Sequence, residues 1–76
     1  MKGTCKFIAE YVEIKGSLFR LSPEDKGQIF EYETLQTTNF KPGVAYYAVT
    51  DSKSYPFPVT AHFLPFDFAR AFKIIS

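Results

Sequence analysis

Few residues of this chain could carry out chemistry, and His62 is the one side chain whose ordinary pKa lies near neutrality. General acid–base catalysis would need a nucleophile or a second titrating group beside it. Its neighbours in the sequence are Ala61 and Phe63, which are both apolar. We therefore interpret His62 as a half-exposed histidine in a strand.

Cys5 is the single cysteine, so no disulfide can form within one chain. No motif around it would lower its pKa, as a nucleophilic thiol requires. One cysteine and one histidine are also too few for a structural zinc site. We expect an inert thiol, no metal and no cofactor.

Paired carboxylates are a third possible source of chemistry. Glu31 and Glu33 would share one face of a strand, where two carboxylates can raise one pKa. A glycosidase would also need a cleft for sugar around the pair, and 76 residues leave little room for one. The four glycines are isolated, so no glycine-rich phosphate loop is present. We predict that the protein is not an enzyme.

Aromatic residues and cations favour a binding function instead. Fourteen of the 76 residues are Phe or Tyr, and residues 39–76 hold nine of them together with a net charge of +2. Exposed aromatics beside cations can anchor a protein partner or stack unpaired bases. We predict protein–protein contacts by an adaptor, inhibitor or regulator. The alternative is a single-stranded nucleic-acid-binding module of OB-like or SH3-like shape. The predicted binding surface is Tyr47, Lys53, Tyr55, Phe57, Arg70 and Lys73.

Turn signals divide the chain into short elements. Lys15-Gly16-Ser17 and Lys41-Pro42-Gly43 are turn sequences, and Ser22-Pro23 is typical of the start of a helical turn that Gly27 ends. The segments between them are rich in β-branched and aromatic residues. The predicted strands are residues 5–14, 18–21, 28–35, 44–50 and 57–64. Residues 5–14 also fit a helix that stops at Gly16, which would make the fold α+β.

The period changes near the end of the chain. Phe68, Phe72 and Ile75 recur at i, i+4 and i+7, which predicts an amphipathic helix over residues 67–75 with Asp67 as its N-cap. The sequence therefore predicts one mainly β domain over residues 1–76. It would be a small bent sheet or barrel of about five short antiparallel strands with a short C-terminal helix.

The small size of the chain and its composition indicate self-association and a location away from membranes. Because a domain this small has a high ratio of surface to volume, some aromatic rings should meet a partner, and we predict a homodimer. The predicted self-association residues are Phe66, Phe68, Phe72 and Ile75. No apolar run approaches the length of a membrane span, so we predict no membrane contact. A lone cysteine is typical of a reducing cytoplasm.

Overall fold

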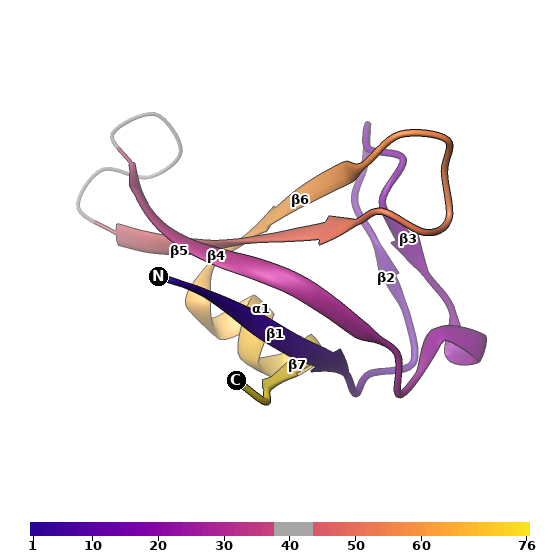
Figure 1. Cartoon of the computed structure of the whole chain (residues 1–76), viewed down its shortest axis with the longest axis horizontal. Helices are drawn as coiled ribbons and strands as arrows, with labels where there is room; N and C mark the ends of the chain where they lie inside the picture. The colour runs from indigo at the N-terminus through magenta and orange to yellow at the C-terminus, as the bar shows by residue number, and fades with distance from the viewer. Residues whose placement is uncertain (38–43) are drawn as a thin grey trace.

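The protein is mainly β and is built on a bent, open sheet (Figure 1). The computed structural model describes residues 1–37 and 44–76, and the side chains of residues 37 and 44 are left out of the description. Five antiparallel strands pair in the order β6-β5-β4-β1-β7, beside a separate β2–β3 hairpin. The predicted fold class is confirmed, with a bent sheet in place of a closed barrel. The elements are β1 (Lys2–Phe7), β2 (Val12–Glu13), β3 (Arg20–Leu21), the 3-10 turn η1 (Pro23–Asp25), β4 (Ile29–Thr37), β5 (Val44–Asp51), β6 (Val59–Phe63), α1 (Pro65–Ala71) and β7 (Phe72–Ile74).

Strand β4 places Glu31 and Glu33 on one face, as the sequence predicted. Phe30 and Tyr32 are buried, whereas Glu31 is exposed and Glu33 half-buried on the opposite face. Pairing with β1 on one side and β5 on the other fixes which face each residue occupies. Because successive side chains of a strand point to opposite faces, one face is apolar and the other is polar. Helix α1 packs against the apolar face through Phe68, whose ring lies 5.6 Å from that of Tyr32.

Phe72 lies at the centre of a cluster of aromatic rings. Its ring centroid is 5.6 Å from that of Phe7, 6.1 Å from Phe30, 5.5 Å from Phe63 and 5.4 Å from Phe68. Aromatic pairs at such distances contribute about 0.5–1.5 kcal/mol each beyond the burial of their area. Much of the high aromatic content is therefore used to build a dense core in a short chain.

The prediction of one strand over residues 5–14 is wrong, and so is its helical alternative. Strand β1 ends at Phe7, whose N–H donates to the carbonyl of Gln28 and whose carbonyl accepts from Gly27. The N–H of Ile8 donates to the carbonyl of Ala71 at 2.8 Å. The two bonds of Phe7 complete the pairing of β1 with β4, and the bond of Ile8 ties the chain to the end of α1. The next residues therefore leave the sheet. Extended pairing resumes only at β2, which pairs with β3 in a separate two-stranded sheet.

The predicted helical turn after Ser22 is confirmed as η1. The N–H of Ser22 donates to Asp25 Oδ2 at 2.8 Å, so the acid closes the start of the turn. Gly16 and Gly27 both have positive φ, at 80° and 92°, which explains why glycine occupies these turns. The predicted Pro42-Gly43 turn lies outside the described residues.

The predicted helix over residues 67–75 is partly wrong. Helix α1 spans Pro65–Ala71 and has Leu64, not Asp67, at its N-cap. Phe72 then adopts an extended conformation and begins β7, because this segment can pair with β1. Phe72 is buried, as the helical period also predicted, so its burial alone does not distinguish a strand from a helix.

The C-terminus is held beside β1 (Figure 1). The N–H of Thr4 donates to the carbonyl of Ser76 at 3.0 Å, and the N–H of Ile75 donates to the carbonyl of Thr4 at 3.0 Å. Gly3 permits this approach: a Cβ at that position would lie 2.0 Å from the Ser76 carbonyl oxygen. The last residues are thus part of the sheet edge.

Candidate functional site

A groove of about 590 Å³ lies between the end of β6, the segment around β2, and α1. Its floor is apolar. Val12 and Ile14 come from the β2 side, Phe63 and Leu64 from the β6 side, and Ala71 from α1. Val12 and Ile14 pack against the core cluster but are only half-buried. The groove therefore presents apolar surface that the fold of the described residues covers only partly.

Polar side chains form the rim of the same groove. Tyr11 and Glu13 stand on the β2 side, His62 on the β6 side, and Asp67 and Arg70 on α1. All five are exposed. An apolar centre with a polar rim is the usual arrangement of a protein-binding surface.

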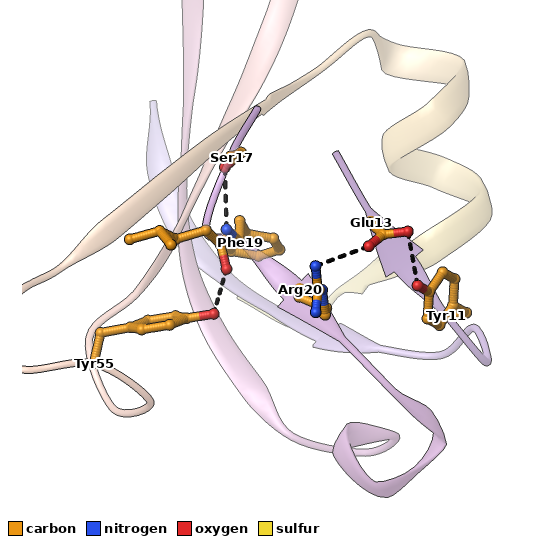
Figure 2. Close-up of polar contacts among 7 residues, drawn as sticks. Tyr11, Glu13, Ser17, Phe19, Arg20 and Tyr55 are labelled. Carbon is orange, nitrogen blue, oxygen red and sulfur yellow. Dashed lines mark hydrogen bonds and ion pairs between the residues drawn. The ribbon is translucent and has the colours of Figure 1, made fainter. Parts of the chain in front are cut away.

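Side-chain contacts hold the β2 side of the rim in place (Figure 2). Glu13 lies between Arg20, with an Nη2–Oε2 distance of 2.9 Å, and the Tyr11 hydroxyl, which donates to Oε1 at 2.9 Å. This hydrogen bond to the carboxylate, followed by desolvation, raises the pKa of Tyr11. Because exposed ion pairs stabilise little, the contacts orient the rim and contribute little to folding.

The loop between β5 and β6 is tied to the chain just before β3 (Figure 2). The hydroxyl of Tyr55 donates a hydrogen bond to the carbonyl of Leu18. Beside it, the Ser17 hydroxyl oxygen accepts from the N–H of Phe19 at 3.0 Å. The loop that leads into β6 is thus hydrogen-bonded to the hairpin that carries β2. This bond holds together the two segments that form the walls of the groove.

Asp51 shapes the first turn of that loop from a buried position. Its Oδ1 accepts the N–H groups of Lys53 and Ser54 at 2.9 and 3.2 Å. Burial raises the pKa of Asp51, but these hydrogen bonds and the Lys53 charge together outweigh burial and hold the pKa below its usual value. Oδ2 has no hydrogen-bond partner among the described protein atoms. Asp51 therefore acts as a structural carboxylate that caps the turn.

The structure does not bring the six residues of the predicted binding surface together. Tyr47 is half-buried and stacks on Phe68, with 4.0 Å between ring centroids. Lys53 donates to the carbonyl of Ile29 at 3.1 Å and lies over the ring of Phe30. Tyr47 and Lys53 therefore have structural roles within their own chain.

The other members lie on different parts of the surface. Tyr55 makes the tie to the β2–β3 side, and Phe57, in the same loop, is 53% exposed. Arg70 lies over the ring of Phe66 on α1 and lines the groove, whereas Lys73 lies on β7, at the other edge of the sheet. Of the predicted set, only Arg70 belongs to the groove.

The predicted self-association residues divide into two pairs. Phe68 and Phe72 are 3% and 2% exposed and belong to the core of their own chain. Phe66 and Ile75 are 72% and 49% exposed and remain accessible on the α1–β7 side. Only the second pair can contact another molecule without unfolding this one.

The residues that could have carried chemistry occupy two separate places: Cys5 lies in the core, whereas His62, Glu31 and Glu33 lie on the polar face of the sheet. Cys5 is fully buried in the core, and burial raises the pKa of its thiol to about 11, the opposite of what a nucleophile needs. His62 contacts the ring of Tyr46 on the polar face. Glu31 and Glu33 lie with His62 around a hollow of about 350 Å³ on that face. Within residues 1–37 and 44–76, no three His, Cys, Asp or Glu side chains are placed to hold a metal ion.

Sequence reasoning missed most of the groove. It placed Tyr11, Val12 and Glu13 inside one long strand and did not consider Leu64 as a surface residue. The alternation of polar and apolar residues from Tyr11 to Ile14 was a usable signal. It could not show that β2 leaves the main sheet and faces the free edge of β6.

Comparisons with known proteins name no relative: no protein-family model, no curated protein and no solved structure matches this chain. No helix among the described residues is long and apolar enough to cross a membrane.

Proposed function

We propose that this chain is a non-enzymatic binding protein, an adaptor, inhibitor or regulator, that takes a segment of a partner protein into the groove between β6 and β2. The observation that supports this most is the half-buried apolar floor of Val12, Ile14 and Leu64 inside a polar rim. A volume of about 590 Å³ falls within the range of about 300–1,000 Å³ typical of ligand sites.

The positions of the reactive side chains also favour binding over catalysis. Cys5 is sealed in the core, and His62 contacts Tyr46. A general base must lie within hydrogen-bond reach of the proton that it removes, and a nucleophile must lie near that base. No such pair is formed between these two residues.

Charge makes the nucleic-acid alternative the weaker proposal. Glu13 and Asp67 line the groove, and Glu31 and Glu33 occupy the polar face of the sheet. Carboxylates at these positions would repel phosphates. Nucleic-acid binding depends on cations that follow the backbone along a continuous path, and the predicted cations do not line one.

Selection from a displayed library of random twelve-residue peptides tests the proposal. Enriched peptides would be synthesised, their affinity measured by calorimetry, and their site mapped by backbone amide chemical shifts. We expect shifts to concentrate at β2, the end of β6 and α1. Leu64→Glu should weaken binding about tenfold or more, because it places a charge on the apolar floor. Phe57→Glu is the control: Phe57 is exposed and does not line the groove.

Two results would overturn the proposal. The first is the absence of any enriched peptide, or shifts that map away from the groove. The second is tight binding of a single-stranded oligonucleotide that weakens steeply with added salt, since each neutralised phosphate releases counterions. Circular dichroism of both variants establishes that each one folds.

We also propose that the protein forms a homodimer and works in a reducing compartment, the cytoplasm. Phe66 and Ile75 are large, exposed and apolar on the α1–β7 side. Burial of Cys5 within the core is compatible with a thiol that never forms a disulfide. Light scattering at high micromolar concentration should show a dimer that Phe66→Glu converts to a monomer. A monomer for the unmodified protein would reject self-association and leave the groove proposal intact.

A further inference from the structure

The geometry points to strand addition: the partner segment is extended and pairs its main chain with the free edge of β6. This inference rests on the proposed function and specifies its chemistry. Strand β6 has β5 as its one neighbour in the sheet order, and no described strand pairs with its other side. The last two residues of that strand, His62 and Phe63, line the groove together with the following Leu64. A chain lying in the groove therefore meets a sheet edge, which is a template for main-chain hydrogen bonds.

The two edges of the sheet differ in a way that favours β6. Proteins protect exposed edges by making them short and by placing lysine or proline on them. Strand β7 has three residues, with Lys73 at its centre directly opposite Lys6 of β1. Strand β6 has five residues, VTAHF, with neither lysine nor proline among them. The edge beside the groove is thus the longer and the less protected of the two.

The walls of the groove specify the side chains of the partner. On β2, Val12 pairs with the buried Leu21, and its neighbour Glu13 pairs with the exposed Arg20. On β6, Phe63 is buried and its neighbour His62 is exposed. Both walls therefore alternate between apolar residues on the core side and polar residues on the solvent side.

A strand inserted between these walls must follow the same alternation, because its successive side chains point to opposite faces. The partner segment should carry aliphatic or aromatic residues at every second position, facing the floor. The intervening residues should be polar and face the rim. A strand paired with β6 lies about 4.8 Å from it, so the insertion extends the sheet towards β2.

An N-methyl scan of the peptides selected above tests this inference. Each synthetic peptide is methylated at one backbone nitrogen at a time, which removes a donor without changing a side chain. Strand addition predicts a loss of affinity of about tenfold at every second position and near-normal affinity between them, because alternate N–H groups face β6. Hydrogen exchange should show newly protected amides in β6 on binding, while β7 remains unchanged.

The outcomes separate this inference from the proposed function. If peptides bind in the groove but the scan shows no two-residue period, strand addition is wrong and the proposed function stands. If no peptide binds, both fail. Dimerisation could already protect the β6 amides in the free protein, and this protection would disappear on dilution to monomer. In that case a second copy of the chain occupies the edge of β6, and the inference is overturned.

Discussion

The buried thiol of Cys5 makes the stability of this protein depend on alkaline pH. The side chain is fully buried, and burial raises its pKa from 9.0 to about 11. A group whose pKa is raised by folding contributes stability that is complete below the unfolded pKa and is lost as pH rises towards the folded pKa. Between about pH 9 and pH 11, the unfolded chain therefore releases a proton that the folded chain retains.

The size of the change in the free energy of unfolding follows from the shift in the pKa of Cys5. One pKa unit corresponds to about 1.4 kcal/mol, so the free energy of unfolding should fall by about 1.4 kcal/mol by pH 10 and about 2.7 kcal/mol at the limit. A core of this size supplies only about 3–5 kcal/mol. Titration of one thiol would thus remove a large fraction of the total stability.

Urea unfolding at several pH values from 8 to 10.5 measures this dependence, with Cys5→Ala as the control. Every other titratable group is common to both proteins, so the difference between the two curves isolates the thiol. In parallel, a thiol reagent should label the native protein only as fast as it unfolds. Equal pH slopes for the two proteins, or rapid labelling of the native state, would refute the reasoning.

Three further predictions concern the fold. Phe72→Ala should cost about 3–5 kcal/mol by leaving a cavity among four aromatic rings, whereas Phe57→Ala, at an exposed position, should cost about 0.5 kcal/mol or less; thermal unfolding compares them. Gly3→Ala should displace Ser76 and increase hydrogen exchange in β7, because the new Cβ would lie 2.0 Å from a carbonyl oxygen; unchanged exchange would contradict this. Tyr55→Phe should lower the free energy of unfolding by about 0.5–1.5 kcal/mol through loss of one hydrogen bond, measured by urea unfolding.

Local patterns in the sequence were sufficient to predict much of the sheet. The alternation through Phe30, Glu31 and Tyr32 predicted both the strand and the face of each residue, because a strand has a side-chain period of two. The helical turn after Ser22 and its end at Gly27 were predicted from backbone chemistry that acts within a few residues.

The groove could not be predicted in the same way. Its walls are β2 and β6, which lie about fifty positions apart in the chain and do not pair with each other. Their opposition depends on where β1 ends, and that end is set by hydrogen bonds of Phe7 and Ile8 to residues of other elements. No local pattern carries that information.

The sequence by itself determined the class of the fold, the faces of its central strand and the turn after Ser22, since these follow from a period of two and from glycine and proline geometry. Tertiary structure decided where β1 stops, that Phe72 begins a strand and not another helical turn, and that the free edge of β6 opens on a groove. The physical reason is the same in each case. These features depend on which distant backbone groups complete a residue's hydrogen bonds, and that pairing exists only once the chain has folded.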